Sequence, residues 1–390
     1  MLYKSDYIYT KLKTETPIES EREFLDLIGS SSIAEEDLLS AFADLRLKLG
    51  ENFKLDNICL LVGNGCSIYA GSKSTTEFNL NNVIKGDEYK DVQSVLDNIA
   101  GLEMEPLLNA LITIKDYYNL VNDTLKEESI KRLIEVIKNN LLSVFVNSMD
   151  YSKLKWHEIF ILKLRAFGCL QKIKIYTTNY DLAFEYVLDK LSIEYENGFT
   201  GFVNRHFNPK SLQSSNKTEL IKVHGSINWI YDKIERVIKE YQPRFKDGRV
   251  MIDDSEQVLI YPTAEKLYQT YNEPYSELMR GMLNTFETKR NVIIVVGYKY
   301  EDEHINDILY KAVANPNNIF YFFDYDASGC EFISKMEELS KDVQNINILY
   351  GKFLASFDTF VRYMVPATPE KTDQEKALEL LQKVLNEYAK

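Results

Sequence analysis

Four short polar or glycine-rich motifs carry the residues of this sequence that are suited to chemistry. Each one follows a run of apolar or β-branched residues typical of a buried strand. In chain order they are Gly63-Asn64-Gly65-Cys66-Ser67, Thr177-Thr178-Asn179-Tyr180-Asp181, His224-Gly225, and Gly297-Tyr298-Lys299-Tyr300 with Asp302 and His304. Glycines let backbone amides approach a phosphate, and an imidazole can accept a proton near neutral pH. The glycine motifs therefore suit a phosphate-containing ligand, and the histidines suit transfer of a proton to or from such a ligand.

Each motif also has an ordinary structural explanation. Gly63 and Gly65 fit a turn that lets a helix pack back onto a sheet, and the residues beyond them are expected to begin a helix. Asn179 and Asp181 are typical helix caps, and a lone histidine such as His224 is more often structural than catalytic. Taken one at a time, the motifs leave these alternatives open.

Two common nucleotide-binding motifs do not fit. A Rossmann dehydrogenase needs a second strand that ends in an acidic residue about 20 positions after the glycines, and KSTTEFNLNNVIKG contains no such strand. Gly71-Ser72-Lys73-Ser74 looks superficially similar to a P-loop, but its spacing is wrong. A P-loop ATPase and a standard dehydrogenase are both disfavoured.

Six apolar runs predict strands that alternate with helical patterns. The runs are NICLLVG, KIKIYTT, ELIKVHG, NVIIVVG, NNIFYFFD and INILYG. Their alternation with helices predicts an α/β fold with a doubly wound, Rossmann-like, mainly parallel sheet. Ligands bind such sheets at the carboxyl ends of the strands, so the four motifs are expected to converge on one edge.

The chain divides into three predicted parts. Residues 1–50 form a helical lead-in, 51–365 the main α/β domain with a helical insertion at about 81–156, and 366–390 a C-terminal helix. Residues 192–246 are expected to be rich in loops. The amphipathic helices of the insertion and the termini can serve a core or a partner equally well.

Composition restricts the class of protein. The 390 residues are 45% hydrophobic and 27% charged, as in a folded protein, and the net charge of −13 disfavours binding to nucleic acid or anionic membranes. The sequence has neither a membrane-spanning apolar stretch nor a secretory signal, so a cytoplasmic location is expected. The four cysteines form no Cys-x-x-Cys pair, which predicts neither disulfides nor a cysteine zinc site, and no metal site is expected.

The order of the motifs resembles the sirtuin-like (SIR2-like) superfamily, particularly its bacterial defence branch. The resemblance rests on Gly-Asn-Gly-Cys-Ser, Thr-Asn-Tyr-Asp, Val-His-Gly and Gly-Tyr-x-Tyr-x-Asp-x-His-Ile, and it covers about residues 55–330. It implies an NAD pocket with Asn179 and His224 in the catalytic positions and Asp181 near the nicotinamide carboxamide. The residues expected to bind NAD are Gly63, Asn64, Gly65, Ser67, Thr178, Asp181, Gly297, Tyr298 and Asp324. Asp324 is equally explained as a turn residue.

Departures from the deacylating sirtuins narrow the implied reaction. Those enzymes carry a four-cysteine zinc module and a Pro-Asp-Phe-Arg type motif, and this sequence has neither. Lys299 also stands where the family often has a small hydroxyl residue. Without the module no second wall for an acyl-lysine peptide is evident. Water is then the expected acceptor, and the implied reaction is hydrolysis of NAD to nicotinamide and ADP-ribose, without zinc.

The resemblance also implies a biological setting. A sirtuin-like chain of this kind is similar to the partner of HerA-type hexameric ATPases in antiphage defence, which implies a homo-oligomer and control of NAD depletion by a partner or by assembly. Two other functions remain open: binding of NAD or ADP-ribose without turnover, and ADP-ribosyl transfer to protein. His157 is expected to be a packing or surface residue, His206 carries no specific signal, and His304 is expected to hold its loop in place.

Overall fold

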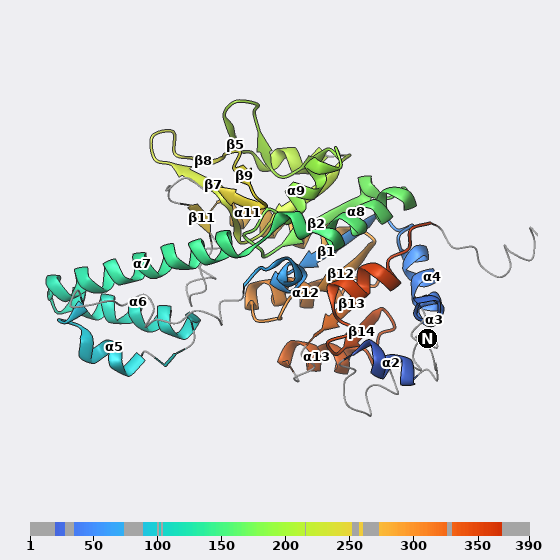
Figure 1. Ribbon diagram of the computed structural model, residues 1–390, viewed down its shortest axis with the longest axis horizontal. Helices are drawn as coiled ribbons and strands as arrows, with labels where there is room; N and C mark the ends of the chain where they lie inside the picture. Colours follow the sequence, from blue (N-terminus) through green and yellow to red (C-terminus); the bar gives the residue numbers. More distant parts are fainter. Residues whose placement is uncertain are drawn as a thin grey trace, which may run out of the picture.

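A seven-stranded parallel sheet lies at the centre of the computed structural model (Figure 1). The structure describes residues 20–27, 35–73, 89–99, 101–102, 104–214, 216–251, 257–259, 273–325 and 330–368. The strand order is β14-β13-β12-β1-β2-β6-β3, and every neighbouring pair is parallel. The strands are β1 (Asn57–Val62), β2 (Ile173–Thr177), β3 (Tyr195–Glu196), β6 (Thr218–Lys222), β12 (Asn291–Val296), β13 (Ile319–Asp324) and β14 (Ile346–Tyr350).

All six predicted strands are present, and β3 is the additional one. The two faces of the sheet bury alternate residues, as the period of two along a strand requires. In β1, Leu60 and Val62 belong to one core cluster, while Cys59 and Leu61 belong to the other. Helices cover both faces, so the predicted doubly wound α/β fold is confirmed.

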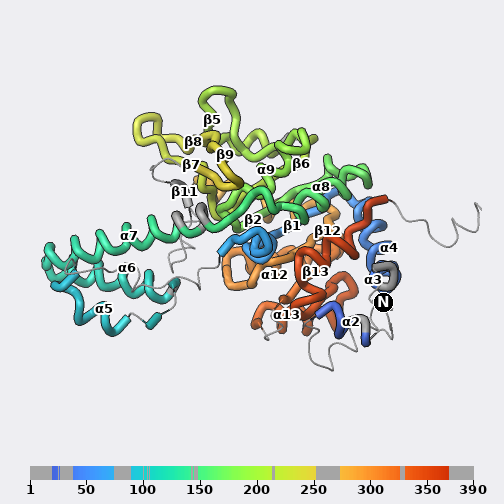
Figure 2. Tube along the Cα trace, in the orientation of Figure 1, coloured from blue at the N-terminus to red at the C-terminus, as the bar shows by residue number. Residues whose placement is uncertain are grey.

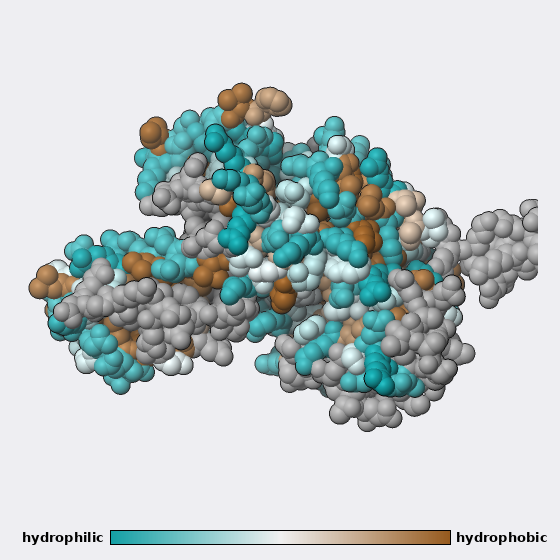
Figure 3. Space-filling view, viewed as in Figure 1, coloured by the Kyte–Doolittle hydropathy of each residue, from teal (hydrophilic) through white to brown (hydrophobic). Residues whose placement is uncertain are grey.

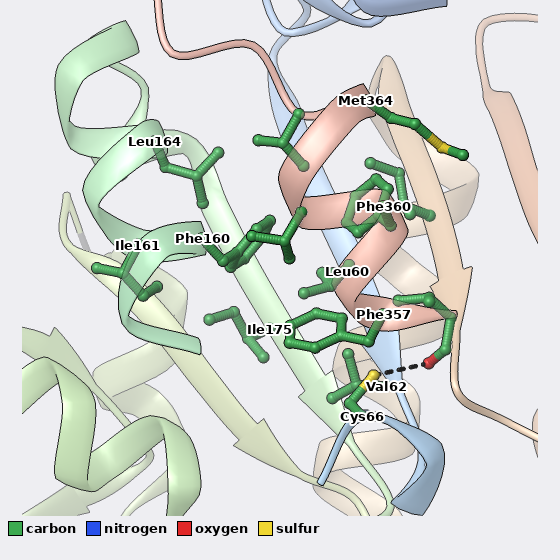
Figure 4. Packing of buried hydrophobic residues seen from close by; sticks show 14 of the residues in the cluster. Leu60, Val62, Cys66, Phe160, Ile161, Leu164, Ile175, Phe357, Phe360 and Met364 are labelled. Carbon is green, nitrogen blue, oxygen red and sulfur yellow. Dashed lines mark hydrogen bonds between the residues drawn. The ribbon is translucent and has the colours of Figure 1, made fainter. Parts of the chain in front are cut away.

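One face packs against helices from both ends of the chain. Figure 4 shows the helix that carries Phe160 and Leu164 beside the helical turn that carries Phe360, and the rings of Phe160 and Phe360 lie 6.0 Å apart. The helices of this face and its surroundings are α2 (Glu21–Leu27), α3 (Glu35–Ala41), α4 (Ala43–Asn52), α8 (Lys155–Phe167), α9 (Ala183–Lys190), α14 (Phe357–Thr359) and the π-helical turn η9 (Phe360–Met364).

The other face packs against three later helices. They are α11 (Tyr275–Thr288), α12 (Glu303–Val313) and α13 (Glu331–Leu339). Each contributes apolar residues at helical spacing, for example Leu278 and Met282 from α11. The shorter helical turns of the chain are η1 (Asn64–Cys66), η2 (Ile68–Ala70), η6 (Tyr151–Lys153), η7 (Leu170–Lys172) and η8 (Pro209–Ser214).

A helical arm extends from the sheet and has a core of its own (Figure 2). It consists of α5 (Gln93–Ile99), α6 (Met104–Leu120) and α7 (Thr124–Ser148), all within the predicted insertion. Its buried cluster, which includes Leu111, Leu133 and Ile137, is separate from the two clusters on the sheet. The predicted domain boundaries stay predictions, and most of the predicted C-terminal helix lies outside the described residues.

The expectation of a loop-rich segment at 192–246 is wrong, because much of it forms a second sheet. A five-stranded sheet has the order β11-β7-β8-β5-β4, and a hairpin of β9 and β10 lies beside it. The strands are β4 (Phe199–Thr200), β5 (Arg205–Phe207), β7 (Gly225–Asp232), β8 (Val237–Glu240), β9 (Arg244–Lys246), β10 (Arg249–Met251) and β11 (Gln257–Leu259). Most are two to four residues long, too short to show a period of two in the sequence.

The tips of these hairpins carry exposed apolar side chains. Phe202 and Val203 between β4 and β5, and Ile234 between β7 and β8, are almost fully exposed. Figure 3 shows apolar groups over the hairpins at the top of the view. Among the residues that the structure describes, no helix is both long enough and apolar enough to cross a membrane.

The separate core of the arm predicts a local effect of mutation. Leu111 is fully buried in it, so Leu111→Ala should lower the stability of the arm by about 2–5 kcal/mol through the cavity it leaves. Hydrogen exchange read by mass spectrometry should show lost protection in 104–148 and little change in β1. Leu125→Ala, at an 80% exposed position of the same arm, is the control and should change little. Equal loss of protection in β1 would show that the arm and the sheet unfold together.

Candidate functional site

The chain reverses its direction of strand addition at β1. It first places β2 on one side of β1 and later places β12 on the other side. Val62, the last residue of β1, pairs with Thr177 of β2 and with Val296 of β12, and Thr177 pairs in turn with Lys222 of β6. The four strands therefore end in register, and the predicted motifs all begin at one edge of the sheet. Reversal points of this kind are where open α/β sheets bind ligands.

The loop after β1 packs directly on the loop after β12. The Gly65 amide donates to the Gly297 carbonyl at 2.9 Å, and Gly297 has a positive φ of 67°. A Cβ atom on Gly63 would lie 2.5 Å from the Gly297 carbonyl oxygen, and one on Gly297 would lie 2.6 Å from the Cys66 nitrogen. The missing side chains thus allow close loop packing. A direct contact of these glycines with a dinucleotide stays a prediction.

The helix expected after the glycines is absent from the part of this segment that the structure describes. Residues 64–70 form the two short turns η1 and η2, and Gly71 follows with a φ of 95°. The Asn64 side chain donates to the Lys73 carbonyl and accepts from the Ser72 hydroxyl. Asn64 therefore ties the loop together, and within the described residues 63–73 no α-helix begins whose N-terminus could point at the site.

Asn179 is buried where the loop after β2 meets the loop after β1. Its Nδ2 lies 3.4 Å from the hydroxyl of Ser67, which is fully buried. Its backbone amide donates to the Thr177 hydroxyl, and the neighbouring Thr178 amide donates to the Val62 carbonyl. The Asn179 Oδ1 is buried and accepts no hydrogen bond from the residues that the structure describes. An unsatisfied buried acceptor costs about 1–3 kcal/mol, and a ligand or a water molecule that donates to Oδ1 would remove that cost.

Lys222 fixes the loop that carries Asn179. It is 2% exposed, and its ammonium donates to the carbonyl oxygens of Tyr180 and Asp181. The same ammonium lies 3.3 Å from a carboxylate oxygen of Glu185 in α9. One carboxylate oxygen of Asp181 accepts from the Ala183 amide, so this residue does cap the start of α9, as the structural alternative proposed.

Burial raises the pKa of Glu185 to about 7. The Lys222 ammonium lowers that pKa, while the nearby carboxylates of Asp181 and Glu240 raise it further. Desolvation is the largest of these causes, because a buried carboxylate loses its hydration. The charge beneath the Asn179 loop is therefore sensitive to pH close to neutrality.

His224 meets a histidine from the fourth motif. It follows β6 by two residues, just as Asn179 follows β2, so the two residues occupy equivalent positions after neighbouring strands. His224 and His304 are both buried, and their Nε2 atoms lie 3.1 Å apart. Asp302 lies beside them, and ligand atoms of the three side chains are within 4.8 Å of one another.

This three-residue cluster has no counterpart in the sequence-based expectations, which assigned no ligand role to Asp302 or His304. The available signal was the spacing Asp-x-His at the start of a helix that follows a buried strand. The predicted convergence of the motifs brings the two loops to one edge of the sheet, but it does not indicate that His224 would contact His304, 80 residues away.

The four loops form a closed ring of contacts. Ser67 contacts Asn179, Lys222 contacts the backbone after Asn179, His224 contacts His304, and Gly297 contacts Gly65. The Ile227 amide also donates to the Tyr180 carbonyl, which joins the second and third loops. The predicted convergence of motifs on one edge is therefore what the structure has.

Two further predicted binding residues lie on the side of the fourth loop. The Tyr298 hydroxyl is buried and bonds to the backbone of Asp302, so it holds its own loop. Asp324 ends β13 and is 6% exposed. Tyr300 lies close to Asp324, and its hydroxyl donates to the carbonyl of the neighbouring Phe323. Burial is the main cause that raises the pKa of Tyr300, and the negative charge of Asp324 raises it further.

The other two histidines lie away from this cluster. His157 is fully buried in α8, where its Nδ1 lies 2.8 Å from the Tyr69 hydroxyl and its ring packs on Phe184 and Phe357. Burial lowers the pKa of His157 to about 3, so it stays neutral, and its role is packing. His206 is exposed on β5.

Part of the chain is similar to a known protein family. Residues 173–349, slightly less than half of the sequence, match the family model described as SIR2-like domain. The match includes Asn179, His224 and Gly297 and begins after the first glycine motif. No curated protein sequence matches the chain significantly.

Two solved Sir2 homologues are similar to the chain over most of its length. One is a mutant in complex with 2'-O-acetyl ADP ribose, and the other is a complex with NAD. Each is 13% identical with a TM-score of 0.37 and covers 81% of this chain, which corresponds to 95% and 93% of the homologues. At that identity and TM-score, neither similarity bears on the site.

The packed glycines predict a stability effect with a matched control. Gly297→Ala places a Cβ at a positive φ and against Cys66, so it should lower the free energy of unfolding by about 1–3 kcal/mol or more. Gly281→Ala, in α11 with no atom within 4 Å of the added Cβ, should be neutral or stabilising. Urea denaturation of both variants checks this. Equal stability of the two would contradict the loop packing described above.

The raised pKa of Glu185 predicts a pH dependence of stability. In the window from its ordinary pKa of 4.5 up to about 7, the folded state holds a proton on Glu185 that the unfolded chain has lost. The free energy of unfolding should therefore fall as pH rises through this window, by on the order of 1–3 kcal/mol. Urea denaturation at pH 5, 6 and 7 should show that Glu185→Gln removes this decline. Glu338→Gln, an exposed position on α13, should retain it, and equal slopes in all three proteins would refute the assignment.

Proposed function

We propose that this chain binds NAD+ at the carboxyl edge of its parallel sheet and hydrolyses the bond between nicotinamide and ribose. The products are nicotinamide and ADP-ribose. The observation that carries the proposal is the buried carboxamide of Asn179, whose Oδ1 is unsatisfied at the reversal point of the sheet. The SIR2-like match over 173–349 and the order of the four motifs support NAD as the ligand.

Asn179 suits a reaction that builds positive charge at carbon. When the glycosidic bond breaks, its electron pair passes to the nicotinamide nitrogen and the ribose C1' takes on oxocarbenium character. A neutral carboxamide oxygen can accept a hydrogen bond from the attacking water or a ribose hydroxyl and orient it. The contact of Asn179 Nδ2 with the Ser67 hydroxyl supports this role, because it holds the carboxamide in place and leaves Oδ1 with no donor among the described residues.

His224 is proposed as the base. Water adds to C1' and must lose one proton, and an imidazole accepts it at neutral pH. His224 occupies the position after β6 that Asn179 occupies after β2, and neighbouring strands are about 4.8 Å apart. Their placement at adjoining strand ends supports a shared substrate. Asp181 keeps its proposed contact with the carboxamide of nicotinamide, in addition to its capping bond.

The remaining binding roles follow the resemblance. Gly63, Asn64, Gly65, Ser67 and Thr178 are proposed to face the dinucleotide from the first two loops. Gly297, Tyr298 and Asp324 are proposed to do so from the other side of β1, with Asp324 near the adenosine ribose. Deep burial of Ser67 and the internal bond of Tyr298 favour contact through their loops' backbone over contact through their hydroxyls.

A four-cysteine zinc module of the deacylase kind does not fit these residues. The thiol of Cys59 lies near Asn291, that of Cys66 donates to the Val296 carbonyl, and that of Cys169 donates to the Leu164 carbonyl. Among the described residues, the one group of metal-ligand type contains no cysteine. This supports water over an acyl-lysine peptide as the acceptor.

The resemblance extends the proposal to the biological setting. We propose that the activity depletes NAD in antiphage defence and is controlled by homo-oligomerisation or by a HerA-type hexameric ATPase. The exposed arm and the apolar hairpin tips at Phe202 and Ile234 are the surfaces available for such contacts.

Release of nicotinamide from NAD+ tests the proposed reaction. The purified chain should release it, alone or with the candidate ATPase, in buffer containing EDTA, and chromatography measures the rate. Asn179→Ala and His224→Ala should each lower the rate by about 100-fold or more, because each removes a group that acts in the transition state. His206→Ala, at an exposed histidine outside the site, should leave it unchanged.

Other outcomes of the same assay identify the alternatives. Bound and unchanged NAD+ would support a binding module without turnover, and radiolabel transferred to a protein would support ADP-ribosyl transfer. Full activity in both alanine variants would disprove the assignment of Asn179 and His224. Thermal unfolding of each variant shows whether a lost rate reflects the site or the fold.

A further inference from the structure

Three buried side chains of metal-ligand type meet at the junction of the third and fourth loops. They are His224, two residues after β6, and Asp302 and His304 at the start of α12. All three are at least nine-tenths buried. Ligand atoms from all three lie within 4.8 Å of one another, and the two imidazole Nε2 atoms face each other at 3.1 Å.

The Asp302 side chain does not cap the helix that it precedes. It is the N-cap residue of α12, where an aspartate normally accepts from the backbone amides of the first turn. Here the side chain makes no capping hydrogen bond. Its backbone is fixed by the Tyr298 hydroxyl, and its carbonyl accepts from Ile305 and Asn306. A carboxylate oxygen lies within 4.8 Å of the ligand nitrogens of the two histidines.

The donor set selects a class of cation. Two imidazole nitrogens and one carboxylate suit Zn²⁺ and similar late first-row ions, whereas Mg²⁺ and Ca²⁺ prefer oxygen ligands only. Zinc–nitrogen bonds of about 2.0–2.1 Å in tetrahedral geometry place two ligand nitrogens about 3.3 Å apart. The 3.1 Å between the Nε2 atoms of His224 and His304 is close to that spacing. Three protein ligands would leave a fourth position for water.

We propose that His224, Asp302 and His304 bind one Zn²⁺-like divalent cation. Each histidine would donate the Nε2 lone pair to the ion, and Asp302 a carboxylate oxygen. An imidazole bound to the ion through Nε2 carries its proton on Nδ1 and has no lone pair left with which to accept another. On the proposed NAD hydrolysis, on which this consequence rests, metal binding is therefore inhibitory and reversible by chelation.

Cobalt binding tests the site without depending on activity. Full-length protein treated with EDTA and desalted should bind one Co²⁺ per chain, with visible absorption bands of tetrahedral or five-coordinate Co²⁺, and Zn²⁺ should displace it. Asp302→Asn, nearly the same shape as the native residue, and His304→Ala should weaken binding by about tenfold or more. His206→Ala should bind as the native protein does, since its imidazole is exposed elsewhere.

Three results would overturn the site. These are no Co²⁺ bands, more than one equivalent bound with the affinity unchanged in Asp302→Asn and His304→Ala, or equal loss of binding in His206→Ala. Thermal unfolding shows whether His304→Ala folds. If it does not, the binding test uses Asp302→Asn alone. Added Zn²⁺ should raise the unfolding temperature of the native chain, because a cation that binds only the folded state stabilises it. The same addition should not raise the unfolding temperature of His304→Ala.

Measurements of activity separate this inference from the proposed function. Nicotinamide release in EDTA measures hydrolysis without metal, and added Zn²⁺ should reduce it by about tenfold or more until EDTA is restored. Co²⁺ binding with no nicotinamide release would leave the metal site standing and remove the proposed reaction. Nicotinamide release in EDTA without Co²⁺ binding would support the proposed reaction and remove the metal site. Faster release with Zn²⁺ would overturn the inhibitory role of the metal.

Discussion

The backbone contact between the loops after β1 and β12 is the constraint on which the candidate site depends. Gly63, Gly65 and Gly297 approach so closely that a Cβ on any of them would meet backbone atoms at less than 3 Å. This contact places Ser67, which in turn meets the carboxamide of Asn179. The position of a proposed catalytic residue thus follows from the absence of side chains at three other residues, none of which needs to touch a ligand.

Polar groups buried beneath the edge of the sheet stabilise the loops and remain sensitive to their surroundings. Lys222 binds two carbonyl oxygens of the Asn179 loop and a carboxylate of Glu185, whose pKa burial raises to about 7. Removing charges from water is costly unless every partner is satisfied, so such a network favours one arrangement of the loop. The same network makes the free energy of unfolding depend on pH near neutrality.

The two roles proposed for His224 exclude each other. As a base it would need a free lone pair on a neutral ring, and as a metal ligand it would give that lone pair to the cation. Its contact with His304 serves either use, because the second imidazole can share a proton or complete a ligand set. If the proposed NAD hydrolysis is correct, the proposed cation site would offer one means of restraining it.

The sequence by itself determined the parallel sheet and the edge where the motifs meet. Runs such as Ile58–Val62 are apolar at every position because both faces of the strand are buried, and their loops must then end at a common edge. Only the tertiary structure decided that Gly63 packs on Gly297, that His224 meets Asp302 and His304, and that β4, β5 and β8 form a second sheet. These contacts join residues far apart in the chain, or strands too short to show a period, and no local pattern encodes them.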